Sequence, residues 1–189
     1  MNGAIIYKGK YGATRQYAEW LGAELNLPVL TPLQVTEKQW QCDFLLIGTP
    51  VYYGKFKIRH WLKRKARQLQ AKKLFFFVVN ATAPGEQEKR NKFVRDSVSY
   101  SIIKQSQFFF LPGRLIHKDL SRFERLVLNM IILLVRDRVK RRALRADIDE
   151  VKKEHLQTII RTIKSLSADT SDIVANMSMR TKPDPGYMI

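Results

Sequence analysis

The sequence has a single cysteine, few acidic residues and no long uncharged apolar segment. Cys42 has no second cysteine to pair with, which excludes an internal disulfide and a cysteine-based metal cage. A membrane-spanning helix needs about 18 uncharged apolar residues. The longest apolar run, residues 126–135, is interrupted by Asn129 and flanked by Arg125 and Arg136, so no such helix is predicted. The N-terminus also lacks the pattern of a secretory signal, and a cytoplasmic location is expected.

The excess of positive charge is the most unusual feature of the composition. Lys and Arg total 34 against 17 Asp and Glu, which gives a formal net charge of +17 over 189 residues. A surface of this kind attracts polyanions such as nucleic acid, anionic lipid or an acidic protein. The alternative interpretation is a solvated basic surface without a specific partner. The length fits one domain with an elaboration.

Short apolar runs alternate with amphipathic runs, which is typical of βα units around a parallel sheet. Five strands are predicted, at residues 4–7, 27–30, 44–47, 74–79 and 108–111. Helices are predicted between Gly12 and Pro28 and at residues 58–69, 87–103 and 147–166. We therefore predict one domain over residues 1–166, with a helical insertion at about 113–145 and an irregular polar tail at 167–189.

The insertion has a pattern of its own from Asp119 to Arg145. Apolar residues recur at helical spacing and are followed by a cluster of arginines and lysines; the apolar ones are Leu120, Phe123, Val127, Met130, Ile131, Leu134 and Val135. An apolar stripe beside basic residues is typical of a helix at the surface of an anionic membrane. The same stripe is also compatible with packing on the protein's own sheet or against a second subunit in a homodimer.

Ligands of doubly wound sheets bind outside the carboxyl ends of the strands, where three loops of this chain are expected to meet. The first loop is Lys8, Gly9, Lys10, Tyr11, Gly12, Ala13 and Thr14; the second, after Gly48, is Thr49, Pro50, Val51, Tyr52, Tyr53 and Gly54; the third is Asn80, Ala81, Thr82, Ala83, Pro84 and Gly85.

Each loop has residues suited to one part of a phosphorylated planar ligand. Backbone N–H groups of the glycine-containing first loop, the following helix N-terminus and the Thr14 hydroxyl can hold a phosphate. The loop has the spacing of neither a Walker A motif nor a dinucleotide fingerprint. The two tyrosines of the second loop offer flat faces for stacking on a ring, and the small residues of the third allow close backbone approach. Ordinary turns, with tyrosines capping the core edge, are the alternative.

Together these loops resemble the flavodoxin family over roughly residues 1–112 and the closing helix. The best-matched segments are Gly12-Ala13-Thr14, where the family has a Gly–any–Thr element, and residues 47–52. The resemblance implies an α/β fold with a doubly wound, five-stranded parallel sheet of order 2-1-3-4-5. It also implies FMN, with its phosphate in the first loop and its ring between the other two. Lys8 and Gly9 stand where the family usually has hydroxyl residues.

A narrower resemblance is to the bacterial flavodoxin-like, menaquinone-dependent protoporphyrinogen dehydrogenases, which are basic and have a helical segment after the last strand. Residues 12–15, 48–55, 79–80 with 88–90, and 112–115 are similar to that family. The resemblance implies oxidation of a porphyrinogen in heme biosynthesis, with electrons passing through FMN to a membrane quinone. Residues of about 114–122 would then lie beside the substrate, or beside the inner face of the membrane.

Two other functions remain open at this point. One is a basic flavodoxin-type electron carrier that docks on an acidic redox partner. The other is a flavodoxin-like protein without flavin that binds nucleic acid or protein, although no recognised nucleic-acid motif accompanies the basic helix at residues 58–69. The three histidines, His60, His117 and His155, lie on different predicted elements, so no metal site is predicted. Only His117 is a candidate for proton handling, and no catalytic residue is assigned.

Overall fold

The computed structural model describes residues 2–80, 85–136, 141 and 146–166. The predicted tail therefore lies outside the described residues, as do four residues of the third loop. A single sheet carries five parallel strands in the order β2-β1-β3-β5-β6. The strands are β1 (Gly3–Tyr7), β2 (Val29–Leu30), β3 (Phe44–Tyr52), β5 (Lys73–Asn80) and β6 (Ser106–Pro112). This confirms the predicted doubly wound sheet of order 2-1-3-4-5.

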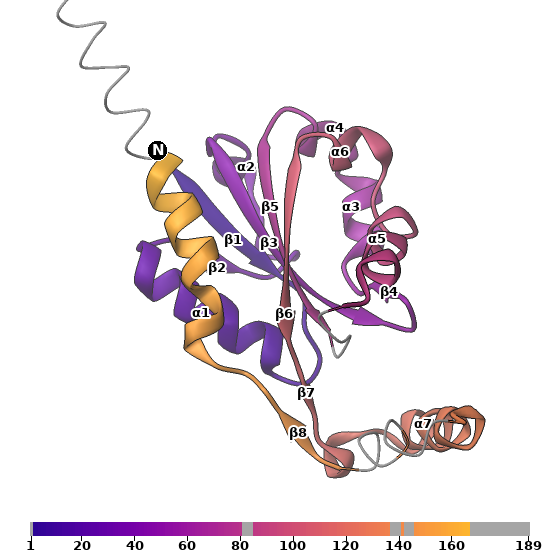
Figure 1. Ribbon diagram of the computed structural model, residues 1–189. Coiled ribbons are helices and arrows are strands. Elements are labelled where there is room, and N and C mark those ends of the chain that lie inside the picture. Colours follow the sequence, from indigo (N-terminus) through magenta and orange to yellow (C-terminus); the bar gives the residue numbers. More distant parts are fainter. Residues whose placement is uncertain (1, 81–84, 137–140, 142–145, 167–189) are drawn as a thin grey trace, which may run out of the picture.

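Helices cover both faces of the sheet, and this explains the long apolar strands (Figure 1). One face carries α1 (Ala13–Leu25) and the final helix (residues 157–166). The other carries α3 (Arg59–Arg64), α4 (Ala66–Leu69), α5 (Gln87–Arg95) and α6 (Tyr100–Ile103), with α2 (Glu37–Trp40) packing nearby through Trp40.

Successive residues of each central strand point to opposite faces of the sheet and are buried on both. In β5, Leu74, Phe76 and Val78 join the cluster under α3 and α5, whereas Phe75 and Phe77 join the cluster under α1. A strand buried on both faces reads as a continuous apolar run, which is why β5 was predictable from sequence.

Strand β3 is longer than predicted, and the chain then turns back to form a hairpin with β4 (Lys55–Phe56). Beyond Gly48 the strand continues beside β5 as far as Pro50 and then pairs with the short antiparallel strand β4. Gly48 makes this extension possible, because a Cβ there would lie 2.1 Å from Cζ of Phe77. The predicted second loop is therefore the end of a strand and a hairpin turn.

Three predicted helices have different bounds in the structure. The helix predicted at 58–69 is divided at Lys65, whose φ and ψ of −105° and 15° are not helical. The helix predicted at 87–103 is two helices, because the connection places the buried hydroxyl of Ser97 where it accepts the Phe56 amide. The final helix begins later than 147, because residues 148–149 form a strand.

The insertion is anchored by a small sheet and ends in a projecting helix. Strand β7 (Arg114–Leu115), which follows β6 in the sequence, pairs antiparallel with β8 (Ile148–Asp149), which precedes the short 3₁₀ helix η2 (Lys153–Leu156). Between them lie η1 (His117–Asp119) and α7 (Arg122–Leu134), which is located beyond the carboxyl ends of the strands (Figure 1). The predicted insertion therefore contains strand β7 as well as a helix, its partner β8 lies just beyond the predicted end at 145, and α7 does not pack on the face of the sheet.

Candidate functional site

A cavity of about 720 Å³ lies at the carboxyl ends of the strands, between the sheet and α7. This volume is within the range of small-molecule and cofactor sites, roughly 300–1,000 Å³. We call it the carboxyl-end cavity.

Residues from all three predicted loops contribute to the walls of this cavity. Those that line it are Lys10, Tyr11, Ala13, Thr14, Pro50, Val51, Tyr52, Tyr53 and Asn80. The remaining described loop residues, Lys8, Gly9, Gly12, Thr49, Gly54 and Gly85, lie outside the lining, and residues 81–84 are outside the described residues. The three predicted loops therefore meet at one cavity, although six of the fifteen described loop residues do not line it.

The first loop presents a series of backbone donors at the start of α1. Gly12 precedes the helix with a φ of 81°, and no side chain caps its N-terminus. The N–H groups of residues 9–14 donate no hydrogen bond to any described residue. Unpaired amides at a helix N-terminus, together with the helix dipole, favour an anion. The loop is therefore built to hold a negatively charged group such as a phosphate.

Lys10 in this loop is held by an acidic residue of the insertion. Its Nζ lies 2.5 Å from Oε1 of Glu124, whose side chain is only 8% exposed, and 3.2 Å from the Tyr52 hydroxyl. The amide and hydroxyl of Ser121 donate to the other carboxylate oxygen, so Glu124 also caps α7. One carboxylate therefore ties the insertion to the first loop.

The charges of this pair are mutually stabilised. The hydrogen bond to Glu124 raises the pKa of Lys10. Burial alone raises the pKa of Glu124, but Lys10, Tyr11 and the Ser121 amide together outweigh it, so that this pKa lies below its ordinary value. Burial, and then the Glu124 carboxylate, raise the pKa of Tyr11. All three groups are therefore held in their normal neutral-pH states.

The two tyrosines of the second loop differ in their roles. Tyr53 and Gly54 form the two-residue turn of the β3–β4 hairpin, with φ of 48° and 73°. Positive φ at both positions is typical of a type I′ turn, but it is unfavourable for tyrosine. The turn nevertheless places the Tyr53 ring, 57% exposed, at the cavity, 4.6 Å from the Tyr52 ring and nearly perpendicular to it. An exposed aromatic ring is thus held in a strained turn at the rim.

Two lysine ammonium groups lie over the Tyr52 ring. Nζ of Lys57 lies 4.9 Å from the centre of its ring, and Nζ of Lys10 lies 5.4 Å away. Burial lowers the pKa of Lys57, and the nearby charges of Lys10 and Lys8 lower it further. A pKa lowered by neighbouring cations indicates a local excess of positive charge, which an anionic ligand would relieve.

Thr49 has a structural role. The residue is fully buried. Its hydroxyl accepts a hydrogen bond from the Ile58 amide at 3.3 Å and donates one to the Pro50 carbonyl oxygen at 3.2 Å. The residue therefore fixes the path of the chain after the hairpin and does not face the cavity.

Asn80 ends β5 with an amide group that is not used within the protein. The residue is 9% exposed and lines the cavity, and its Nδ2 atom has no hydrogen-bond partner among the described residues. A buried polar atom without a partner is costly and indicates an unmet ligand or water. Asn80 is thus positioned to donate to a polar edge of a bound molecule.

The three predicted loops do not include the far wall of the cavity. That wall contains Val79, Arg90, Phe110, Leu111, Pro112, Gly113, Arg114, Leu115, Leu120, Glu124, Val127, Leu128, Ile148 and Glu150. Arg114 pairs with Asp149 at 2.8 Å and lies next to Gly12 of the first loop. Of these residues, Arg114, Leu115 and Leu120 fall in the segment, about 114–122, that the resemblance placed beside a substrate.

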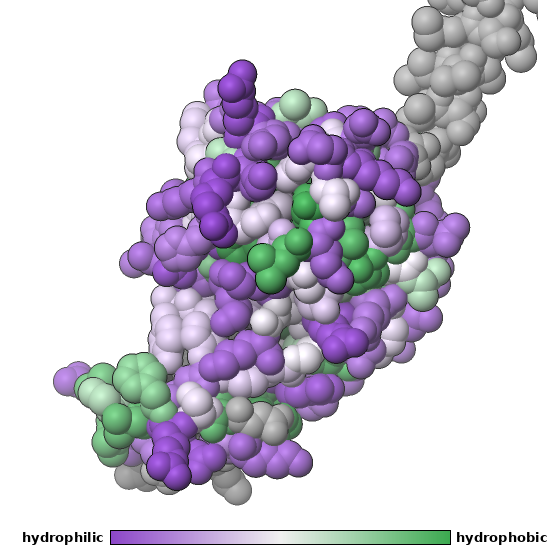
Figure 2. All heavy atoms as spheres, turned by 180° about the vertical axis from the view of Figure 1, so that it is seen from behind, coloured by the Kyte–Doolittle hydropathy of each residue, from purple (hydrophilic) through white to green (hydrophobic). Residues whose placement is uncertain are grey.

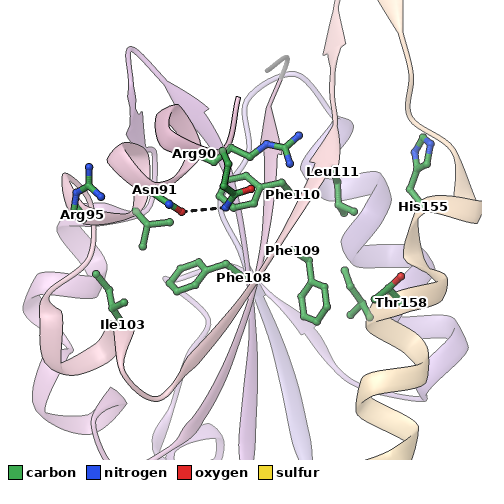
Figure 3. Close-up of a pocket in the computed structure, with 13 residues that line it drawn as sticks. Arg90, Asn91, Arg95, Ile103, Phe108, Phe109, Phe110, Leu111, His155 and Thr158 are labelled. Atoms are coloured by element: carbon green, nitrogen blue, oxygen red, sulfur yellow. Dashed lines mark hydrogen bonds between the residues drawn. The ribbon is translucent and has the colours of Figure 1, made fainter. Parts of the chain in front are cut away.

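A second hollow, of about 580 Å³, follows the open edge of β6 (Figure 3). Its side chains come mainly from β6 and α5, with others from α6, η2 and the final helix, and Arg90 lies over the Phe110 ring at 5.3 Å. Figure 3 shows Phe108 and Phe109 pointing to opposite sides of the strand. None of the predicted site residues lines this hollow, which is the groove left beside an edge strand.

The predicted histidines are not brought together. His117 in η1 contacts Asp147, with 2.9 Å between Nδ1 and Oδ1, and does not line the carboxyl-end cavity. His155 lies 3.2 Å from the Tyr17 hydroxyl. Among the described residues there is no group of three or more side chains suited to holding a metal ion.

The family model for the flavodoxin domain matches residues 4–139. The chain belongs to the flavodoxin-domain family. This match covers the five parallel strands from Ala4 onward, all three loops and the whole of α7. No curated protein matches this flavodoxin-domain chain significantly in sequence.

Several solved structures of bacterial proteins also show similarity to the chain. The Trp repressor binding protein from Bacillus subtilis is 17% identical, with a TM-score of 0.46 over 59% of this chain and 83% of that one. A WrbA-like flavodoxin from Agrobacterium tumefaciens is 17% identical, with a TM-score of 0.44 over 68% and 96%. The Fusobacterium nucleatum flavodoxin bound to flavin mononucleotide is 14% identical, with a TM-score of 0.40 over 60% and 70%.

Proposed function

We propose that this flavodoxin-domain protein binds FMN in the carboxyl-end cavity and acts as an FMN-dependent oxidoreductase. The observation that carries the proposal is the set of unused donors at the cavity: the free amides of the first loop and the unpartnered Nδ2 of Asn80. They match, respectively, a phosphate and the polar edge of a planar ring.

The residues present fit the cofactor in chemistry and arrangement. Backbone N–H groups of residues 9–14 and the cation of Lys10 would hold the phosphate, which accounts for Lys8 and Gly9 in place of hydroxyl residues. The Tyr53 ring offers a face for stacking, and Asn80 a donor for the ring edge. Bound FMN supplies one- or two-electron redox chemistry, while the protein provides orientation, electrostatics and exclusion of water.

The space beyond the predicted loops favours an enzyme over a simple electron carrier. Leu120, Val127 and Leu128 of the insertion form an apolar wall of the cavity, and Arg90 and Arg114 add positive charge. An apolar molecule with carboxylate groups matches this wall. Protoporphyrinogen, with its apolar tetrapyrrole and two propionates, is the substrate we propose, and a quinone is the proposed electron acceptor.

The first test is a titration of the desalted protein with FMN, followed by quenching of flavin fluorescence, with riboflavin as the matched control lacking phosphate. We expect saturable binding of FMN. Riboflavin should bind at least about tenfold more weakly, because a hydrogen bond to a charged group contributes about 1.5–3 kcal/mol. Equal affinities would contradict the role of the first loop, and no binding at high micromolar FMN would refute the proposal.

A second assay separates enzyme from carrier. FMN-loaded protein is mixed with protoporphyrinogen and a soluble quinone under anaerobic conditions, and porphyrin fluorescence is followed. Turnover that depends on both reagents supports the oxidoreductase. Flavin binding without porphyrinogen turnover favours an electron carrier, whose association with an acidic partner would slow as salt increases.

A further inference from the structure

Helix α7 has a large apolar face that the described chain does not cover. The exposed fractions are 66% for Phe123, 58% for Leu126, 56% for Met130, 77% for Leu133 and 78% for Leu134. Figure 2 shows hydrophobic side chains gathered on the lobe that projects beyond the sheet. Scattered exposed apolar residues are common, but a contiguous set on one helix marks an interaction site.

This face is separate from the one by which α7 rests on the protein. Glu124 and Ile132 are 8% and 5% exposed, and Val127 and Leu128 are half-buried at the carboxyl-end cavity. The predicted single stripe is therefore divided: Val127 faces the protein, whereas Phe123, Met130 and Leu134 face solvent. The helix is already docked through one side, so its second apolar side is left for a partner.

Cations border the exposed apolar face. At 100° per residue, Arg122 and Arg125 fall on one flank of the strip formed by Phe123, Leu126, Met130, Leu133 and Leu134, and Arg136 follows two residues after the end of the helix. All three arginines are exposed. Packing two copies of this face together would bring the arginines of both copies close to it, in a chain that already has a net charge of +17. The charge therefore disfavours a second copy and favours an anionic surface.

We propose that α7 is a peripheral docking helix for an anionic lipid bilayer. The exposed apolar side chains would enter the boundary between headgroups and acyl chains, and the flanking arginines would contact lipid phosphates. The described part of the chain has no helix that could span a membrane. Docking would also bring the carboxyl-end cavity, lined by the inner side of α7, close to the lipid.

The test is flotation of the full-length protein with vesicles of phosphatidylglycerol and phosphatidylcholine in equal parts, and with pure phosphatidylcholine vesicles. The test variant is Leu126→Glu/Leu133→Glu. The control is Leu33→Glu/Tyr100→Glu, which places the same charges at residues 97% and 72% exposed elsewhere. Circular dichroism checks that both variants are folded.

We expect the wild-type protein and the control to bind the anionic vesicles and to bind pure phosphatidylcholine much more weakly. The α7 variant should lose at least about tenfold in partition coefficient, because a leucine side chain leaving water contributes about one order of magnitude.

Equal binding of the two variants would overturn the proposal, because only general charge attraction would then act. A wild-type dimer in sedimentation velocity that becomes monomeric in the α7 variant would also overturn it, because the face would then bind a second copy. The assay needs no flavin, so its outcome is independent of the proposed cofactor.

Discussion

The ion pair between Lys10 and Glu124 leads to a counter-intuitive prediction about cofactor affinity. Lys10 belongs to the loop proposed to hold the FMN phosphate, yet it is engaged by a carboxylate of the insertion. A phosphate that takes up Lys10 must compete with Glu124. The variant Glu124→Gln keeps an oxygen that accepts the Ser121 amide, but removes the competing charge. We therefore expect this variant to bind FMN more tightly than the wild type.

The magnitude follows from the environment of the pair. The Lys10 side chain is 37% exposed and that of Glu124 is 8% exposed. Exposed ion pairs contribute about 0.2–1 kcal/mol, and hydrogen bonds to charged groups contribute about 1.5–3 kcal/mol. Because Lys10 is partly exposed, we place the free energy of this pair between the two ranges, at about 1 kcal/mol. Removing the competing interaction would then raise FMN affinity roughly fivefold.

The assay is a parallel titration of wild type, Glu124→Gln and Lys10→Gln with FMN and with riboflavin. We expect Glu124→Gln to tighten FMN binding and Lys10→Gln to weaken it, while riboflavin affinity stays nearly constant in both. A loss of FMN affinity in Glu124→Gln would refute the competition. Equal changes for FMN and riboflavin would show that the phosphate is not the group concerned.

The same carboxylate predicts a pH dependence of stability. The pKa of Glu124 in the folded protein lies below its ordinary value of 4.5. The stabilisation from its ionised form is therefore complete above pH 4.5 and is lost as the pH falls through the folded-state pKa. The difference between wild type and Glu124→Gln in urea midpoint should be largest near neutral pH and should narrow in acid. A difference that widens in acid would contradict the sign of the shift.

Two further substitutions test how the hairpin beside the cavity is held. Gly48→Ala should destabilise the protein by at least about 1–3 kcal/mol, because overpacking forces the buried Phe77 ring to move, whereas Gly85→Ala, with nothing within 4 Å of its Cβ, should have little effect in the same urea titrations. Ser97→Ala leaves the buried Phe56 amide without its 2.8 Å partner. It should cost about 1–3 kcal/mol and should weaken flavin binding, and an unchanged urea midpoint would contradict this account.

The local sequence was sufficient for the sheet and for the location of the cavity. Strands β1, β3 and β5 are recognisable because both faces of a parallel sheet are buried, so their residues are apolar almost without interruption. Loops that follow such strands meet at the carboxyl edge by topology alone. The positions of Lys10, Tyr53 and Asn80 at one cavity were therefore predictable before any side-chain geometry was known.

Long-range contacts decided the rest. The hairpin at Tyr53 exists because β3 continues past Gly48. This extension requires glycine at position 48, because the Phe77 ring of the neighbouring strand occupies the space of a side chain. The contact between Lys10 and Glu124 joins residues 114 positions apart. Periodicity placed the apolar residues of α7 on one helix, but only packing separated those that face the cavity from those that face solvent. Local pattern determines which segments are apolar or helical, whereas the neighbours of each side chain are set by how the segments pack.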